Sequence, residues 1–164
     1  MRLEDLFARA FVQGASVTDE VARGLAKSVR SMYTDASRWR IYPDVVPCLE
    51  RLSAQGWEHF VLSNHVPELE KLISQLGLAC HFNAVYCSAV TGVEKPHPLA
   101  FRMLQEVVTD ASELWMIGDS WQADICGAIQ AGIKAILVRK PNPEAKHFCP
   151  DLSELPSMLA TALK

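Results

Sequence analysis

Polar residues suited to phosphoryl chemistry follow short apolar runs at three points of the chain. Ser63 and Asn64 follow one run, Lys95 lies in the segment after a second, and Asp119 follows a third. A carboxylate is a ligand for a hard cation such as Mg²⁺, which takes few protein oxygens and relies on substrate phosphate for others. A lysine and a hydroxyl, together with backbone N–H groups at a helix start, bind phosphate. These residue types indicate a phosphate and Mg²⁺ site, provided that the fold brings them together.

The elements that would position these residues alternate between strands and helices from residue 42 onward. Short apolar runs bounded by turn residues predict strands at residues 59–63, 84–87, 114–117 and 135–138. Apolar residues three and four positions apart predict helices at residues 45–55, 69–76, from 98, at 121–131 and from 153. This alternation predicts an α/β fold, a Rossmann-like parallel sheet with flanking helices. Ligands bind beyond the carboxyl ends of such strands, which is where the polar residues lie.

Capping and turn residues mark where these elements begin and end. Asp44 is predicted to cap the helix that stops at Gly56, and His97 to cap the helix that follows it. Gly77 is predicted to end the helix 69–76. The segment 139–150, which contains three prolines, is predicted as a loop.

The first 40 residues are predicted to be a helical segment distinct from the α/β core of residues 41–164. One apolar stripe at helical spacing comprises Leu3, Leu6, Phe7, Ala10 and Phe11. A second stripe comprises Val21, Leu25, Val29 and Met32. Between them, Ser16 precedes Asp19 at the spacing of a capping box, which predicts the start of the second helix.

Composition excludes several classes of protein. The 164 residues are 49% hydrophobic and 21% charged, which is typical of a soluble globular protein. A net charge of −3 argues against a nucleic-acid partner, and no apolar run is long enough to cross a membrane. The acidic start of the chain is not a secretory signal. Five cysteines without a C-x-x-C spacing favour free thiols in the cytoplasm.

Three motifs carry a family resemblance, and they follow one another along the chain as Ser63-Asn64, Lys95-Pro96-x-Pro98-x-x-Phe101 and Gly118-Asp119-Ser120-x-x-x-Asp124. In this order they resemble motifs two, three and four of the haloacid dehalogenase-like (HAD) superfamily. The likeness covers about residues 42–164. It implies the Rossmann-like core of that superfamily, with residues 1–40 similar to the later part of its helical cap.

The resemblance implies a role for each matching residue. Ser63 would bind the transferred phosphoryl group with Asn64 beside it, and Lys95 would neutralise charge between nucleophile and phosphate. Asp119 would ligate Mg²⁺, and Asp124 would support the metal. The implied activity is a Mg²⁺-dependent phosphatase acting on a small phosphorylated metabolite. Lys95 and the two aspartates favour this activity over the dehalogenase branch.

For several of these residues, a structural role remains as an alternative. His65 and Trp121 are candidate substrate contacts, although a histidine at a helix start is commonly structural, and Trp121 is equally suited to covering the sheet edge. Asp124 could cap the helix that follows it, since carboxylates favour helix N-termini. Ser63 could likewise cap the helix after residue 66 while binding phosphate.

The first motif of the superfamily, Asp-x-Asp-x-Thr, has no counterpart in this sequence, which contains no Asp-x-Asp. Its first aspartate would be the nucleophile and its second the general acid and base. The family's sheet order places the missing strand in the centre of the sheet, between the strand that ends at Ser63 and the strand that ends at Asp119. We therefore expect an N-terminally shortened chain that does not turn over phosphate esters.

The alternative is a non-catalytic HAD-like protein. A strand from a partner, or from a second copy in a homodimer, would then fill the central gap by β-addition. A phospho-acceptor receiver domain also uses a carboxylate, a hydroxyl and a lysine. It needs an acceptor aspartate at an early strand end, and no such aspartate is present.

Overall fold

The computed structural model describes residues 17–162. The chain divides into two compact units, residues 1–41 with 68–79 and residues 42–67 with 80–164. Each unit is described by itself below. The predicted stripe from Leu3 to Phe11 and the predicted cap Ser16 lie outside the described residues.

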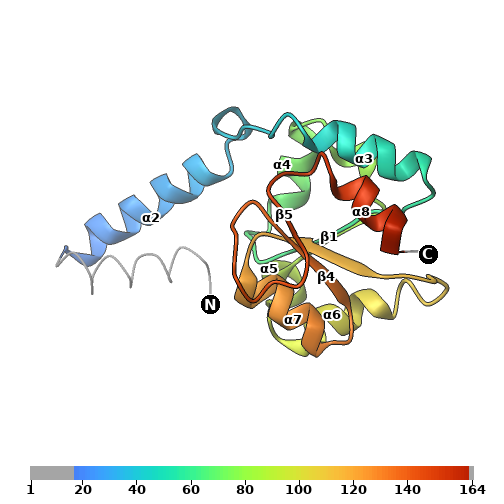
Figure 1. Ribbon diagram of the computed structural model, residues 1–164. Helices are drawn as coiled ribbons and strands as arrows, with labels where there is room; N and C mark the ends of the chain where they lie inside the picture. Colours follow the sequence, from blue (N-terminus) through green and yellow to red (C-terminus); the bar gives the residue numbers. More distant parts are fainter. Residues whose placement is uncertain (1–16, 163–164) are drawn as a thin grey trace. The chain divides into compact units, whose positions relative to one another are not determined.

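The larger unit has the predicted α/β architecture (Figure 1). Its strands are β1 Phe60–Ser63, β2 Ala84–Cys87, β3 Trp115–Gly118, β4 Lys134–Val138 and β5 Phe148–Cys149. All pairings between them are parallel, as β1 with β2, β3 with β4, and β4 with β5. Four of these strands coincide with the predicted apolar runs to within one residue at each end, so the predicted fold class is confirmed.

The strands form two sheets, one of β1 and β2 and one with the order β3-β4-β5. Within the described residues, β1 and β3 are therefore each paired along one edge only. The break falls between these two strands, where the family's sheet order places the strand of the first motif. Unpaired strand edges attract other chains and are usually covered.

Helices connect and cover these strands. In the larger unit they are α3 Val45–Ala54, α5 Ser88–Thr91, α6 Pro98–Gln105, a π-helix Trp121–Cys126, α7 Gly127–Gln130 and α8 Leu155–Ala162. His97 caps α6 as predicted, because its Nδ1 accepts a hydrogen bond from the Leu99 N–H at 3.2 Å. Pro98 occupies the first turn of α6, where no N–H is needed.

Two apolar clusters lie on opposite faces of β4. Ile136 and Val138 point to one face and pack with α3 and α8, whereas Ala135 and Leu137 point to the other and pack with α6 and α7. Successive side chains of a strand alternate between its faces, so one apolar strand serves both clusters. At Gly127 the backbone lies so close to Phe101 that a Cβ would lie 2.7 Å from the phenyl ring.

Asp44 occupies the predicted N-cap position of α3, but its side chain makes no capping hydrogen bond. Its carboxylate instead accepts hydrogen bonds from Arg139 at 2.7 Å and from the Leu152 N–H at 2.6 Å. Burial raises the pKa of Asp44, but these two hydrogen bonds outweigh burial and hold the pKa below its usual value. Asp44 therefore joins the start of α3 to two distant loops.

The segment 139–150 is not entirely a loop, because it contains the short strand β5. Phe148 and Cys149 pair with Leu137 and Val138 of β4. Two residues are too few to produce an alternating pattern, so the sequence offered no signal for this strand. The prediction of a continuous loop was wrong here.

The smaller unit contains α2 Asp19–Tyr33 and α4 Leu69–Gln75, together with the short 3₁₀ turn Ala36–Arg38. A second 3₁₀ turn, Ala79–His81, spans the boundary of the two units. An ion pair joins Arg30 of α2 to Glu68. No helix in the described part of the chain is long and apolar enough to span a membrane.

The apolar stripe predicted for α2 is not the buried face of that helix. Val21, Leu25 and Met32 are 50%, 40% and 49% exposed, whereas Ala22 and Ala26 are fully buried. The two faces are adjacent and share the same spacing, so periodicity could not distinguish them. Thr18 is the N-cap residue of this helix, and its side chain accepts a hydrogen bond from the Val21 N–H.

Candidate active site

Lys95 and Asp124 form a buried ion pair at the break between the two sheets. Lys95 Nζ lies 2.7 Å from Asp124 Oδ1, and the two side chains are only 9% and 7% exposed. The same ammonium donates a hydrogen bond to the backbone carbonyl of Leu62 in β1. The Lys95 ammonium therefore links β1 to the π-helix that follows β3. Charged groups this deeply buried persist only when paired, as they are here.

Asn64 fixes the backbone around Lys95. Its side-chain amide donates to the Lys95 carbonyl and accepts from the Lys95 N–H, both at 2.8 Å. A side-chain amide bonded in this way mimics a strand pairing and leaves Lys95 little freedom. The predicted second and third motifs are thus in direct contact. The peptide bond between Lys95 and Pro96 is cis.

The fourth motif, Gly118-Asp119-Ser120-x-x-x-Asp124, places two carboxylates near the end of β3. Asp119 follows the strand directly and its side chain is 51% exposed, whereas Asp124 is buried in the π-helix. Asp124 Oδ2 accepts a hydrogen bond from the Ser120 N–H at 3.0 Å, and Ser120 Oγ accepts from the Ala123 N–H at 3.1 Å. This reciprocal cap confirms that Asp124 stabilises the helix start, in addition to pairing with Lys95.

Gly118 is needed for this geometry. A Cβ at residue 118 would lie 2.3 Å from Asp124 Oδ2 and 2.4 Å from its Cγ. Since the Asp124 carboxylate is held by Lys95 and by the Ser120 N–H, it cannot simply move aside. The glycine therefore lets the end of β3 pass close to the buried carboxylate.

The turn after β1 is held by the end of β2. Cys87 Sγ lies 3.1 Å from the carbonyls of both His65 and Val66, and Ser88 Oγ accepts from the His65 N–H at 3.2 Å. These contacts fix the backbone immediately after Ser63, which is the last residue of β1. Trp121 packs against the apolar cluster around α6 and α7, as expected of a residue that covers the sheet. The proposed substrate contacts of His65 and Trp121 stay predictions.

The donor set fits a Mg²⁺ ion that retains other ligands. Within residues 17–162, no three His, Cys, Asp or Glu side chains come together as a complete metal site. Mg²⁺ does not require such a site, because it is commonly held by one or two carboxylates with phosphate oxygens and water. The carboxylate of Asp119 is half-exposed, whereas that of Asp124 is buried and held by Lys95 and the Ser120 N–H.

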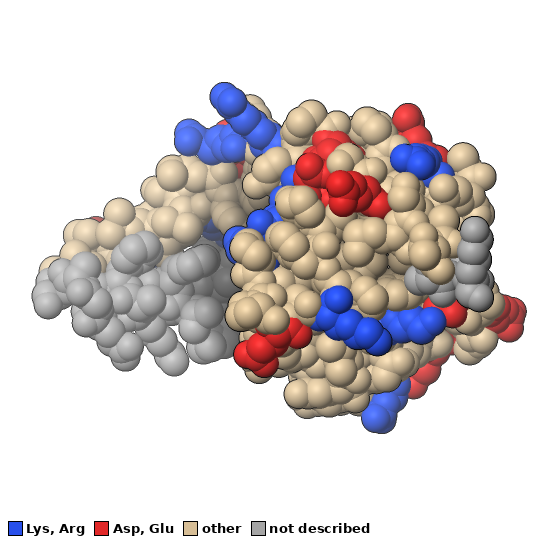
Figure 2. Space-filling view, viewed as in Figure 1, with Lys and Arg blue, Asp and Glu red and all other residues tan. Residues whose placement is uncertain are grey.

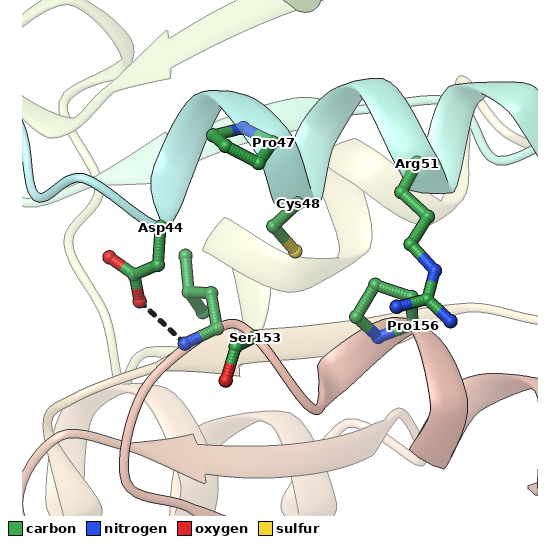
Figure 3. A pocket seen from close by; sticks show the side chains of 7 residues that line it. Asp44, Pro47, Cys48, Arg51, Ser153 and Pro156 are labelled. Carbon is green, nitrogen blue, oxygen red and sulfur yellow. Dashed lines mark hydrogen bonds between the residues drawn. The ribbon is translucent and has the colours of Figure 1, made fainter.

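A cavity of about 240 Å³ lies away from these residues, between α3 and the segment 152–156. Asp44 and Arg51 stand at its two ends, and Cys48 and Pro156 line it (Figure 3). Burial raises the pKa of the Cys48 thiol to about 11, which makes the thiol unreactive. The cavity is smaller than the roughly 300–1,000 Å³ usual for ligand sites, and none of the predicted site residues line it.

The surface charge is mixed. Figure 2 shows acidic and basic side chains in separate small groups, with other residues between them. The described residues of this face carry no continuous basic surface of the kind that binds nucleic acid.

Comparison with known sequences decides the family. The sequence model of the haloacid dehalogenase-like hydrolases matches residues 2–132. The chain belongs to the haloacid dehalogenase-like hydrolase family. Within that family it is 36% identical to phosphoserine phosphatase of Thermus thermophilus over 148 aligned residues, and this alignment covers 88% of the chain. The match spans only 58% of that relative, so the activity of a whole HAD protein is not thereby assigned to these residues.

Solved HAD structures have the same fold. A HAD phosphatase from Thermococcus onnurineus superimposes with a TM-score of 0.71 at 18% identity, covering 96% of this chain and 88% of that one. A 2-haloacid dehalogenase from Pseudomonas syringae pv. Tomato also gives a TM-score of 0.71, at 28% identity, covering 98% and 73%. The HAD fold predicted from three motifs is therefore confirmed.

The contact of Lys140 with Asp119 was not predicted from the sequence. Its Nζ lies 2.7 Å from Asp119 Oδ2, and this contact raises the pKa of the ammonium. Lys140 lies outside the three motifs, in a segment predicted as a loop, so no sequence signal could have indicated it.

Proposed function

We propose that these residues form the phosphate-binding and metal-binding part of a Mg²⁺-dependent phosphatase site for a small phosphorylated metabolite. The observation that carries the proposal is the buried Lys95–Asp124 pair, which joins the end of β1 to the carboxylates after β3. The similarity to a phosphoserine phosphatase supports a phosphate ester as substrate class. The chain's membership in a hydrolase family supports the reaction type.

In this proposal Ser63 and the backbone after it bind the phosphoryl group, and Lys95 supplies positive charge beside them. Asn64 acts by holding the Lys95 backbone, since both polar atoms of its amide are used there. Asp119 would ligate Mg²⁺ directly, and Asp124 would support it from behind. The metal, when bound, would supply further positive charge to the phosphoryl oxygens.

A carboxylate nucleophile is absent from the proposed set. The 164 residues contain no Asp-x-Asp, and among strands β1 to β4 only β3 is followed directly by an aspartate, which is Asp119. We therefore propose that these residues bind phosphate and metal but do not hydrolyse the ester. Turnover would require a carboxylate delivered to the break between β1 and β3.

The second candidate is a non-catalytic HAD-like protein that acts through a partner or a second copy of itself. The unpaired edges of β1 and β3 favour it, because an extended strand from another chain could pair with both. Under either function we propose a cytoplasmic location, supported by five cysteines that are all free thiols.

Replacing Asp119 by Asn is expected to abolish Mg²⁺ binding while leaving the fold intact. The side chain is half-exposed, so its loss disturbs no packing, but the neutral amide is a poor ligand for a hard cation. Isothermal titration of Mg²⁺ into both proteins measures the effect, and circular dichroism checks the fold. Glu113→Gln is the matched control, since it also removes a carboxylate paired with a lysine. Equal heats for the wild type and Asp119→Asn would refute the metal assignment.

A further inference from the structure

The backbone turns sharply where β4 ends. Arg139 has a φ of 69°, and it is the one residue other than glycine with positive φ in the described chain. The Lys140 N–H donates to the Val138 carbonyl at 2.7 Å, so a hydrogen bond spans two residues around Arg139. These two features define a γ-turn with positive φ, a rare and strained conformation. Such strain persists only where the surroundings enforce it, and it clusters at functional sites.

The surroundings that enforce this turn act on Arg139. Its guanidinium pairs with Asp44 at 2.7 Å and lies 4.0 Å above the Tyr42 ring. The Arg139 side chain is 21% exposed, and the Asp44 side chain that holds it is 14% exposed. Arg139 N–H also donates to the Cys149 carbonyl at 3.1 Å. The backbone that presents the next residue is thereby fixed.

The backbone of Lys140 is fixed by the turn, whereas its side chain is largely exposed. Its side chain is 75% exposed, and the ammonium reaches Asp119 Oδ2 at 2.7 Å. An exposed pair of this kind is weak, because water screens the charges and the long side chain loses rotamer freedom. The contrast with the buried Lys95–Asp124 pair is clear, since that pair cannot open without leaving a buried charge.

We propose that Lys140 is the exchangeable counter-ion of Asp119, which competes with a divalent cation for this carboxylate and so sets the affinity of the site. This inference rests on the proposed metal site. The turn at Arg139 keeps the ammonium near Asp119, and solvent exposure lets it leave when the cation binds. Lys140 therefore affects cation binding through its contact with Asp119 and does not itself contact the cation.

The test is Mn²⁺ binding, followed by the electron paramagnetic resonance signal of the free ion, in the full 164-residue chain. Lys140→Met should bind Mn²⁺ about two- to fivefold more tightly than the control, which is the range expected for loss of one exposed ion pair. The matched control is Lys134→Met. Lys134 is also an exposed lysine, paired with Glu113 at 2.7 Å, and it lies at the opposite end of β4.

Both variants lower the net charge by one, so a difference between them reports the local contact with Asp119. Lys140→Arg should restore the affinity of the wild type, because the guanidinium keeps the charge. Equal affinities for Lys140→Met and Lys134→Met would overturn the inference, as would weaker binding by Lys140→Met. If Asp119→Asn still abolishes Mn²⁺ binding in that case, the assignment of Asp119 as a metal ligand holds and only the inference about Lys140 is overturned. Absence of Mn²⁺ binding in every variant would overturn both.

Discussion

Lys95→Met is expected to lower the free energy of unfolding by about 3–5 kcal/mol, the cost typical of breaking a buried ion pair. The substitution keeps most of the side-chain volume but leaves the Asp124 carboxylate buried without its cation. It also removes the donor to the Leu62 carbonyl, which is the polar link from the first sheet to Asp124. Urea denaturation followed by circular dichroism measures the change.

Two variants make this expectation specific. Lys134→Met breaks an exposed pair with Glu113 and should cost no more than about 1 kcal/mol. The double variant Lys95→Met with Asp124→Asn should recover part of the loss, because no unpaired charge remains while the amide oxygen still accepts from the Ser120 N–H. A Lys95→Met protein as stable as Lys134→Met would show that the pair is not buried as described.

Gly118→Ala is expected to lower the free energy of unfolding by about 1–3 kcal/mol through overpacking, and to weaken divalent cation binding at the same time. The added methyl would overlap Asp124, whose carboxylate is held on two sides. Either Asp124 leaves its partners or the end of β3, which carries Asp119, shifts, so the arrangement of the two carboxylates changes. Thermal unfolding and Mn²⁺ titration measure the two effects on the same protein.

The control for this substitution is Gly24→Ala. Gly24 lies within α2 with open space around it, so alanine there should raise helix stability by about 0.5–1 kcal/mol. A Gly118→Ala protein with unchanged stability and unchanged cation affinity would contradict the close approach of β3 and Asp124.

The parts of the fold that could be predicted are those encoded by local pattern. β1 to β4 are apolar runs bounded by turn residues, and motif residues stand at the ends of β1 and β3. The break between the sheets also followed from sequence, because the motif that belongs on the central strand was absent. His97 was predictable as a cap because it directly precedes a helix-starting proline.

The parts that could not be predicted depend on contacts between distant residues. The phosphate-binding role of Asn64 stays a prediction, whereas the pairing of its amide with the backbone of Lys95, thirty-one residues later, was not predicted. Asp44 was assigned to a helix cap, but its carboxylate is taken by Arg139, a stronger cationic partner. The contact of Lys140 with Asp119 follows a γ-turn at Arg139, and no residue type in the sequence predicts a turn of this kind. In α2, two adjacent faces shared the helical period, and only packing could choose between them.

The measurement that tests the central claim most directly is Mg²⁺-dependent hydrolysis of p-nitrophenyl phosphate by the 164-residue chain. Asp119→Asn, purified in parallel, is the control for contaminating phosphatases. We predict no turnover by either protein, although the wild type binds Mg²⁺, because phosphate and metal ligands are present without a carboxylate nucleophile. Turnover by the wild type that is lost in Asp119→Asn would contradict the account and would mean that a nucleophile lies within these residues.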